Sequence, residues 1–462
     1  MRTKIIATAG PSLGDREKIE KAIKSGVSVF RLNFSHGDHK THKKLIANIR
    51  EASNQIEQEV AIIQDLSGPK LRVGKLPEPV KVSEGDTVIL RKEGMASSKD
   101  IPVDYPYLME DVKKGERILI EDGKIFLEVI EKGRDYLKTK VINGGIIKSE
   151  KGVNLPDSSL RVPSFTDKDR RDLEFGLENG IDLIALSFVK GPDDVKGPKE
   201  IAGEDFPVIA KIERKEAIKF LEEIIEAFDG IMVARGDLGV ELPLEEVPIL
   251  QKRMISIANR KRKIVITATQ MLSTMIENPY PTRAEVSDIA NAVFDGSDAL
   301  MLSGETAIGK YPIEAICMMK RIIEQTESSE LLWKYRDLLD WEKTEPPEAL
   351  AESAVLTSEK IGASAIMVFT ASGRTALGVS KYRPRVPVIA LTHSILTQRR
   401  VSIFWGIKGE VVDFISHTDR MIEEGISLLL KKSYIKKGDL MVITAGKTPM
   451  RGATDMIKVL RV

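Results

Sequence analysis

The chain has 462 residues, 30% of them charged, and a formal net charge of +1. That length exceeds one ordinary hydrophobic core, so we expect two or three domains. The near-zero net charge offers no general attraction to nucleic acid or to an anionic membrane, and we predict neither as a partner. No apolar run approaches the ~20 residues of a membrane span. The N-terminus shows no signal-peptide pattern, and with a single cysteine the sequence predicts a cytoplasmic protein.

Eight short apolar runs each end in a polar or charged cluster. They are KIIATAG, VSVFRLNFS, VAIIQDLS, IDLIALSFV, FPVIAKIE, GIMVARGD, KIVITATQ and DALMLSGET. Continuous runs rich in Val and Ile are typical of strands buried on both faces of a parallel sheet, and amphipathic helical stretches separate most of them. The pattern predicts an α/β fold, a (β/α)8 TIM barrel over residues 1–69 and 162–335. In such a barrel the functional groups lie at the carboxyl ends of the strands.

Two segments do not fit the barrel. Residues 70–161 interrupt it with strand patterns and an Asp122-Gly123 hairpin turn, so we expect a small inserted β-barrel domain at the catalytic rim, a candidate lid. Residues 345–462 follow the linker TEPPEAL. There AIMVFTASG, PVIALTHS, EVVDF and DLMVITAG alternate with helical sequence, which predicts a smaller C-terminal α/β domain.

The fifth barrel strand ends in Lys211-Ile212-Glu213, and the sixth ends at Asp237 in ARGDLG. Lys211 and Glu213 are two residues apart in a strand, so both side chains project into the barrel mouth. This pair alone leaves a structural ion pair and an active-site role both open. The backbone amides around Gly236 lie next to a helix start and can bind an anion. Glu213 with Asp237 suits Mg²⁺, which takes one or two carboxylates with water and substrate oxygens.

Other strand ends carry polar groups with an ordinary alternative. One face of the second strand carries Arg31, Asn33 and Ser35. These side chains form either an active-site group or a hydrogen-bond network at the barrel rim. The segment DLSGPKLR places a Gly-Pro hinge before the insertion, with cations that either decorate the surface or grip a phosphate. Thr269 and Ser303 end the seventh and eighth strands, where hydroxyls position water or merely fill a strand.

Two further patterns resemble ligand-binding motifs. His36, His39 and His42 recur every three residues, but they precede a helix and resemble its solvated first turn, so we do not expect a metal there. AGKT near the C-terminus mimics a P-loop, but Met441 stands where the upstream glycine is required, so we exclude a Walker motif.

The segment TASGRTA joins a strand to a helix in the C-terminal domain. Backbone amides and hydroxyls at a helix N-terminus can hold a phosphate. The residues expected to do so are Thr370, Ser372, Gly373, Arg374 and Thr375, with Lys447 and Arg451 as further candidates.

Taken together, these segments resemble the pyruvate kinase family. RLNFSHG, DLSGPKLR, KGVNLP, AKIE, ARGDLGVE, ATQML with NPYPTRAE, and MLSGETA occur in family order and near family spacing. With TASGRTA the resemblance covers almost the whole chain. It implies transfer of the phosphoryl group of phosphoenolpyruvate to ADP, giving ATP and, after protonation of the enol, pyruvate.

The resemblance also assigns roles on the substrate side. Glu213 and Asp237 would hold Mg²⁺ (Mn²⁺ as a substitute), and the amides of Gly236 and Asp237 would bind the substrate carboxylate. Lys211 and Arg31 would balance the charge that spreads over the phosphoryl oxygens during transfer, as a loose transition state requires.

Two other groups of residues are assigned by the same resemblance. Thr269, a substrate-binding and catalytic residue, would lie with Ser303 where a proton reaches the enolate carbon through water. The nucleotide phosphates would be bordered by residues of the barrel and the lid: Asn33, Ser35, His36, Arg72 and Lys151.

The chain departs from the family at one position. Many members bind K⁺ through residues matching Asn33, Ser35, Asp65 and the Leu66 carbonyl, beside an acidic residue where this chain has Lys70. An ammonium is a compact point charge that would repel K⁺ by roughly 1–4 kcal/mol at contact distances. We therefore expect a K⁺-independent enzyme in which Lys70 replaces the ion. A lysine paired with a surface carboxylate is the alternative.

The resemblance further implies a homotetramer and an allosteric phosphate ligand, either a sugar phosphate or AMP. Two other functions are the alternatives. A mutase or aldolase barrel acting on phosphoenolpyruvate or pyruvate would need no ADP, lid or TASGRTA domain. A catalytically silent effector-binding protein would be expected to lose Lys211, Glu213, Asp237 or Thr269, and all four are present.

Overall fold

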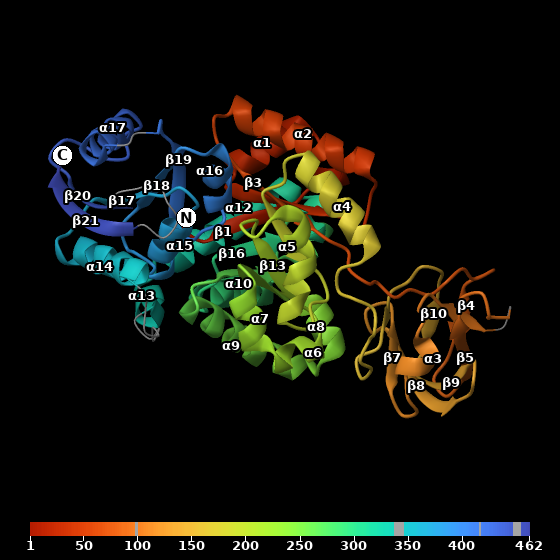
Figure 1. Cartoon of the computed structure of the whole chain (residues 1–462). Helices are drawn as coiled ribbons and strands as arrows, with labels where there is room; N and C mark the ends of the chain where they lie inside the picture. Colours follow the sequence, from red (N-terminus) through yellow and green to blue (C-terminus); the bar gives the residue numbers. More distant parts are fainter. Residues whose placement is uncertain (98–99, 337–345, 415–416, 447–453) are drawn as a thin grey trace.

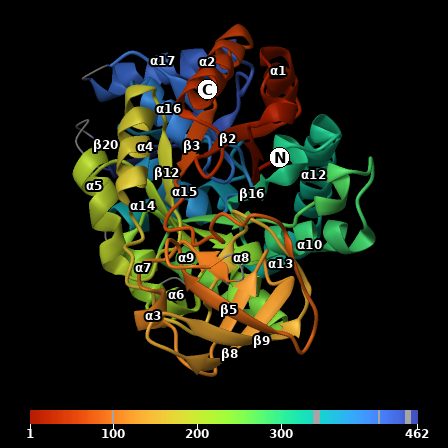
Figure 2. The ribbon, with the colours of Figure 1, turned by 90° about the vertical axis from the view of Figure 1, so that its right-hand side faces the viewer.

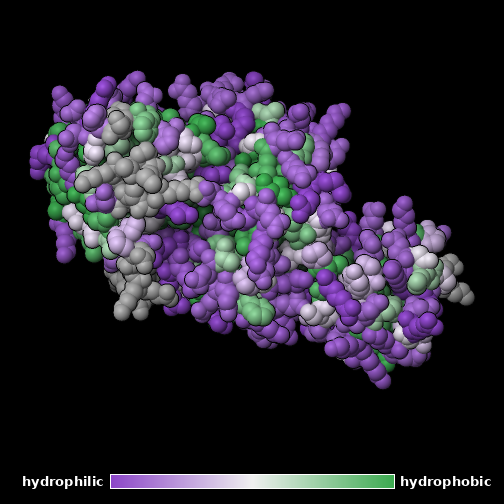
Figure 3. Space-filling view, viewed as in Figure 1, coloured by the Kyte–Doolittle hydropathy of each residue, from purple (hydrophilic) through white to green (hydrophobic). Residues whose placement is uncertain are grey.

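The computed structural model describes residues 1–97, 100–336, 346–414, 417–446 and 454–462. A central barrel carries the C-terminal domain on one side and the inserted lid on the opposite side (Figure 1). In the view of Figure 3 the surface of barrel and lid is mostly hydrophilic. Within the described ranges, no helix is long and apolar enough to cross a membrane.

Eight parallel strands close the barrel, and they pair in chain order, with β1 also pairing with β16. The strands are β1 Lys4–Thr8, β2 Val27–Asn33, β3 Ala61–Asp65, β12 Leu183–Leu186, β13 Val208–Ile212, β14 Gly230–Ala234, β15 Ile264–Ala268 and β16 Ala299–Leu302. Nearly all of their residues are buried, because aliphatic side chains fill the interior and helices cover the outside. The predicted (β/α)8 barrel is confirmed.

Helices connect the barrel strands or follow the last of them. They are α1 Arg16–Lys24, α2 His39–Gln55, α4 Asp167–Glu178, α5 Lys196–Ala202, α6 Lys215–Lys219, α7 Leu221–Ala227, α8 Arg235–Glu241, α9 Val247–Arg260, α10 Arg283–Phe294, α11 Gly304–Ala307, α12 Pro312–Glu327 and α13 Glu330–Arg336. Short 3₁₀ turns add η1 Pro11–Leu13, η2 Pro192–Val195, η3 Leu244–Glu246 and η4 Ser273–Ile276.

The lid is an all-β domain with one short helix. Its elements are β4 Val80–Val82, β5 Thr87–Lys92, β6 Ile101–Val103, α3 Leu108–Asp111, β7 Arg117–Ile120, β8 Ile125–Lys132, β9 Leu137–Asn143, β10 Gly145–Ile147 and β11 Val153–Asn154. Six strands pair in the order β11-β7-β8-β9-β5-β6. Bridges Arg72–Gly152 and Val73–Val103 join the two edges, which closes the sheet as predicted.

The predicted hairpin at Asp122-Gly123 is confirmed. Ile120 pairs with Ile125, and the turn between them holds Asp122 at φ +56° and Gly123 at φ +82°. Positive φ at consecutive turn residues matches the twist of the flanking strands. Figure 2 shows the lid strands in front of the barrel.

The C-terminal domain is the predicted α/β layer structure with one strand more than expected. Its elements are α14 Pro346–Lys360, β17 Ala365–Phe369, α15 Arg374–Lys381, β18 Val388–Thr392, α16 Ile395–Val401, β19 Ile407–Val411, α17 Thr418–Lys431, β20 Leu440–Gly446 and β21 Thr454–Arg461. β19 begins before the expected EVVDF run. The unpredicted β21 runs antiparallel to β20 at the sheet edge, where mostly half-exposed residues show no continuous apolar run.

A buried charge cluster joins this domain to the end of the barrel at which β16 begins. Lys381 at the end of α15 forms an ion pair with Asp298, just before β16, and donates to Asn259 Oδ1 at 3.0 Å. Arg383 contacts the other Asp298 oxygen at 2.9 Å, and its guanidinium lies 4.8 Å from the ring centroid of Trp405. Burial lowers the pKa of Lys381 to about 8 against the attraction of Asp298. The interface therefore depends on mutual compensation of buried charges.

Replacing Lys381 with methionine should lower the free energy of unfolding by about 3 kcal/mol, because Asp298 loses one of its buried partners. Urea titrations followed by tryptophan fluorescence, to which Trp405 at this interface contributes, measure the change. The matched control is Lys360→Met at the exposed end of α14, expected within about 0.5 kcal/mol of the wild type. Equal stability of the two variants would contradict the argument.

Candidate functional site

The barrel mouth holds a buried ammonium between two carboxylates. Lys211 Nζ on β13 lies 2.8 Å from Glu213 Oε1 and 3.1 Å from Asp65 Oδ1, and it donates to Ser187 Oγ at 2.8 Å. Burial alone would lower the pKa of Lys211, but Asp65 and Glu213 outweigh it and raise the pKa. The site therefore contains a permanent positive charge at a fixed position.

Asp65 binds a second cation from the neighbouring strand β2. The Arg31 guanidinium contacts Asp65 Oδ2 through Nε and Nη2, both at 2.6 Å, and donates through Nη1 to Thr8 Oγ1 at 3.2 Å. Burial would raise the pKa of Asp65, but Lys211 and Arg31 hold it below its usual value. The sequence suggested Asp65 only as a ligand for a monovalent ion, because its contact with both cations depends on barrel closure.

Glu213 and Asp237 form the expected pair of carboxylates. Glu213 is 2% exposed, and its Oε2 accepts a hydrogen bond from the Phe188 amide at 2.8 Å. Burial raises the pKa of Glu213 and the charge of Asp237 adds to this, whereas Lys211 lowers it. The half-buried Asp237 side chain has no hydrogen bond or ion pair to the described residues.

This donor set fits a hard divalent cation and does not fit zinc. Zinc sites use three or four protein ligands, and the described ranges contain no group of three or more His, Cys, Asp or Glu side chains that could hold a metal. Two carboxylates whose charges interact, one of them without a partner among the described residues, suit a hard divalent cation that completes its coordination with water and other oxygens.

The end of β15 is strained and tied to α8. Thr269 has φ +68°, an unfavourable conformation for a β-branched residue, and Gln270 follows at φ +54°. Thr269 Oγ1 accepts from the Gly236 amide at 2.8 Å and donates to the Ala268 carbonyl at 2.7 Å. Arg235 donates to the Thr269 carbonyl at 2.6 Å. Strain supported in this way is typical of functional sites.

The amide of Gly236, assigned to the substrate carboxylate, is thus hydrogen-bonded to Thr269 in this structure. At the end of β16 the situation differs. The Ser303 amide donates to Glu305 Oε2 at 2.7 Å, while Ser303 Oγ is buried and has no partner among the described residues. Ser303 therefore offers an unused hydroxyl at the barrel mouth.

Several predicted nucleotide-binding residues come together on the other side of the mouth. Partial burial lowers the pKa of His36, and so do the charges of Lys70, Arg72 and Arg31, which places these cations near its ring. The Arg72 side chain makes no hydrogen bond or ion pair within the described ranges. A phosphate would supply the missing negative charge.

Three other residues of this set are held locally. Asn33 Oδ1 accepts from the Ser35 amide at 3.1 Å. Lys151 forms an ion pair with Glu121 of the lid at 3.1 Å, so no contact in this structure brings it to the barrel mouth.

Two of the four predicted monovalent-cation ligands are bound by other protein groups. The Leu66 carbonyl accepts from Ser187 Oγ at 2.6 Å, and Asp65 binds Lys211 and Arg31. The Lys70 side chain borders this site, and part of its surface reaches solvent. Partial burial and Lys211 lower its pKa against the opposing charges of Asp237, Glu213 and Asp65. Its ammonium makes no hydrogen bond or ion pair with any described side chain, so Lys70 lies near these charges without contacting the four expected ligands.

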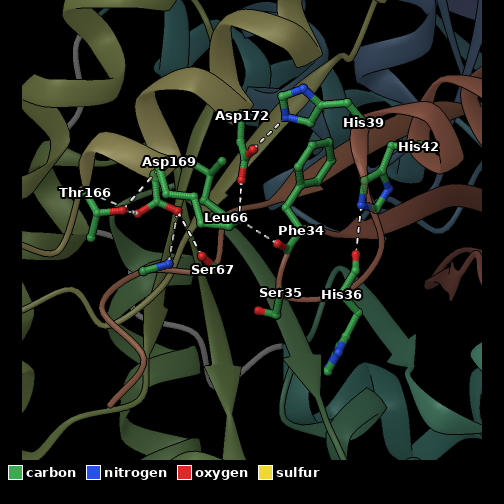
Figure 4. Close-up of polar contacts among 12 residues, drawn as sticks. Phe34, Ser35, His36, His39, His42, Leu66, Ser67, Thr166, Asp169 and Asp172 are labelled. Atoms are coloured by element: carbon green, nitrogen blue, oxygen red, sulfur yellow. Dashed lines mark hydrogen bonds and ion pairs between the residues drawn. The ribbon is translucent and has the colours of Figure 1, made fainter. Parts of the chain in front are cut away.

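The three histidines do not converge (Figure 4). His39 begins α2, lies 2.8 Å from Asp172 Oδ1 and stacks on Phe175. His42 stacks on Phe34 with ring centroids 3.9 Å apart, and its Nε2 lies 2.9 Å from the His36 carbonyl. The expectation of a solvated first turn is wrong for His42, which is buried because its ring packs against Phe34.

The TASGRTA segment connects β17 to α15. Thr370 Oγ1 accepts from the Gly373 amide at 2.9 Å, and Gly373 adopts φ +89°, a conformation that favours glycine. Arg374 is exposed, whereas Ser372 and Thr375 are half-buried. Lys447 and Arg451, the further candidates, lie outside the described residues.

Comparisons with known proteins agree over both parts of the chain. Family models described as the pyruvate kinase barrel domain and the pyruvate kinase alpha/beta domain match residues 1–316 and 348–460. Pyruvate kinase 2 of Synechocystis sp. is 45% identical over 99% of this chain and 79% of that protein. Pyruvate kinase of Thermotoga maritima is 43% identical over 100% of this chain and 99% of that protein. A crystal structure of a pyruvate kinase from Cryptosporidium parvum aligns with a TM-score of 0.93 and 38% identity, covering 100% of this chain and 96% of that one.

The burial of His42 predicts an acid-sensitive fold. Burial lowers the pKa of His42 below its ordinary value of 6.5, and its Nδ1 has no partner within the described ranges. His42 therefore binds a proton near pH 6.5 in the unfolded chain but only at lower pH in the folded protein. Since the unfolded state then binds more protons, the free energy of unfolding falls as the pH drops from 6.5 through the lower pKa of the folded state. Thermal unfolding between pH 7.5 and 5 should show a weaker pH dependence in His42→Gln than in the wild type. Substituting the exposed His417 with Gln should leave the profile unchanged.

Proposed function

This chain belongs to the pyruvate kinase family of phosphotransferases, and we propose that its barrel mouth transfers the phosphoryl group of phosphoenolpyruvate to ADP in a Mg²⁺-dependent reaction. The observation that carries this proposal is the buried Lys211 ammonium between Asp65 and Glu213, with Glu213 next to the unpartnered Asp237. Such an arrangement supplies fixed positive charge beside a divalent-metal site. Phosphoryl transfer needs both.

The residues divide the work between the two substrates. Lys211 and Arg31, held by Asp65, stabilise the charge on the phosphoryl oxygens in flight. Glu213 and Asp237 would hold Mg²⁺, or Mn²⁺ in its place, and a bound divalent ion neutralises charge on the substrate oxygens. The nucleotide phosphates are assigned to the face that carries His36 and Arg72, bordered by Asn33, Ser35 and Lys151.

Protonation of the enol product is assigned to the ends of β15 and β16, where Thr269 and Ser303 lie. The Thr269 hydroxyl donates its hydrogen bond to the Ala268 carbonyl. We therefore propose that Thr269 orients a water molecule and does not itself donate a proton to the enol. The buried, unpartnered Ser303 hydroxyl supplies a second hydrogen-bonding group for that water. The Gly236 amide releases Thr269 when it binds the substrate carboxylate.

Regulation and assembly are proposed from family membership and the C-terminal loop. The exposed Arg374 beside the left-handed Gly373 supports binding of a phosphorylated effector, a sugar phosphate or AMP, at residues 370–375. The homotetramer and the cytoplasmic location stay predictions.

Removing the buried ammonium should lower the rate of the chemical step. Lys211→Met is expected to reduce kcat by about 10²-fold or more, with a smaller effect on the KM for phosphoenolpyruvate, because the charge acts mainly in the transition state. Steady-state kinetics of purified protein, checked for folding by thermal unfolding, measure this. Lys219→Met, at the exposed end of α6, should retain the wild-type kcat. A normal kcat in Lys211→Met would remove that residue from the mechanism.

The K⁺ requirement tests the role of Lys70. Pyruvate formation from phosphoenolpyruvate and ADP with Mg²⁺ is measured in sodium-free tetramethylammonium buffer, with and without K⁺. We expect full activity without K⁺, because the nearby positive charge of Lys70 already acts on Asp65, Glu213 and Asp237. Lys70→Glu should gain a dependence on K⁺. Activity only with K⁺ in the wild type would discard the Lys70 role, and no ADP-dependent pyruvate from folded protein in either buffer would favour a mutase or aldolase.

A further inference from the structure

The chain crosses between barrel and lid twice, and the two crossings meet at one buried carboxylate. The outgoing crossing contains Ser67 and Gly68, and the returning crossing ends at Thr166, which caps α4. Asp169, in the first turn of α4, lies between them (Figure 4). We propose that Asp169 is a positioning residue that couples the two crossings and thereby sets the orientation of the lid. This inference rests on the proposed function only in its kinetic consequence.

Each oxygen of Asp169 serves one crossing. Oδ1 accepts from the Gly68 amide at 3.1 Å and from Ser67 Oγ at 3.4 Å. Oδ2 accepts from the Thr166 amide at 2.9 Å and from Thr166 Oγ1 at 2.6 Å. The side chain is fully buried, so water does not compete for these four donors.

An ordinary capping box explains only half of these contacts. In a capping box the residue at the third helical position bonds back to the N-cap residue, as Asp169 does to Thr166. The bonds from Oδ1 to Gly68 and Ser67 reach a segment about one hundred residues away in sequence. They join the outgoing crossing to the helix that receives the returning one.

The packing around Gly68 directs its amide toward Asp169. Gly68 adopts φ +61°, and a Cβ there would lie 2.8 Å from Phe188 Cδ2 and 3.1 Å from Ser187 Cβ. The outgoing crossing is therefore pressed against the end of β12. The returning crossing is bound to the same place, because Ser164 Oγ donates to the Phe188 carbonyl at 2.8 Å.

The same helical turn also supports the nucleotide side of the mouth. Lys168 Nζ donates to the Phe34 carbonyl at 2.9 Å and lies 2.5 Å from Asp172 Oδ2. Phe34 directly precedes Ser35 and His36. One turn of α4 thus holds both the lid hinge and the loop opposite it, so the lid residue Arg72 and the barrel residue His36 are positioned from a common support.

A carboxylate is required because all four contacts come from donors. Asparagine keeps the volume of Asp169 but offers one acceptor oxygen, and its NH₂ would face N–H and O–H donors on the other side. Asp169→Asn therefore uncouples one crossing. The lid then samples more orientations, and the apparent affinity for the nucleotide falls by the fraction of molecules in the competent orientation. Groups proposed for phosphoenolpyruvate stay on barrel strand ends and are unaffected.

Kinetics of the full-length enzyme test the functional consequence. In Asp169→Asn the KM for ADP should rise about 10-fold, while the KM for phosphoenolpyruvate stays within about twofold. A merely structural role would lower the active fraction, and so kcat, without separating the two KM values. Asp167→Asn, which removes an exposed charge from the same helical turn, should leave both KM values unchanged.

The distance between lid and barrel tests the coupling without any substrate. Spin labels are placed at Lys81→Cys on the lid and Glu222→Cys on α7, both exposed, in a Cys317→Ser background. Pulsed dipolar spectroscopy should show a wider distance distribution in Asp169→Asn than in the parent. Glu285→Gln is the matched control, because Glu285 caps α10 through Thr282 and bonds Thr274, away from the lid hinge. It should leave the distribution unchanged.

The outcomes separate the two proposals. An unchanged distribution in Asp169→Asn overturns the coupling, whatever the activity. A widened distribution in Asp169→Asn, together with a wild-type protein that shows no pyruvate kinase activity, supports the coupling and contradicts the proposed function. Should Asp169→Asn fail to fold, Thr166→Val removes one of the returning contacts and must widen the distribution for the proposal to stand.

Discussion

The candidate site depends on the compensation of charges around Asp65. This buried carboxylate binds Lys211 of β13 and Arg31 of β2. Each cation also reaches a further strand end, since Lys211 donates to Ser187 after β12 and Arg31 donates to Thr8 of β1. None of these groups would be stable in the barrel alone, because a buried ion without a partner costs several kcal/mol. Together they form a cluster whose positive charges stay fixed and protonated. The proposed metal site and the proposed substrate site both adjoin this cluster.

Strained backbone completes the mouth. Phe188 at φ +55° directs its amide to Glu213 and its carbonyl to Ser164 of the returning lid crossing. Thr269 at φ +68° is supported by Arg235 and Gly236 in the same way. Residues that link a metal carboxylate to a hinge, or one strand end to the next, are expected to carry strain when surrounding contacts over-determine them. Glu213 and the returning lid crossing therefore share one rim residue, Phe188.

The sequence predicted which residues form the site more fully than it predicted which of them contact one another. Lys211 and Glu213 were expected to project together because residues two apart in a strand share a face, and the structure brings them within 2.8 Å. The contribution of Ser187 and Phe188 was missed, since neither carries a charge. Asp169 was missed because its helix reads as an ordinary amphipathic one. Lys151 was assigned to the nucleotide, yet in this structure it pairs with Glu121 inside the lid. The buried stack of His42 on Phe34 was also not foreseen.

The sequence by itself determined the eight barrel strands, the insertion after the third strand and the polar residues at the strand ends. Those features follow from local periodicity, because a strand buried on both faces requires a continuous apolar run. Only the tertiary structure decided that Asp65 serves two cations, that Asp169 joins two distant crossings and that Lys70 lies near the charges without contacting them. These are contacts between segments 30 to more than 100 residues apart. Closure of the barrel sets them, and no local pattern encodes which donor will face which acceptor.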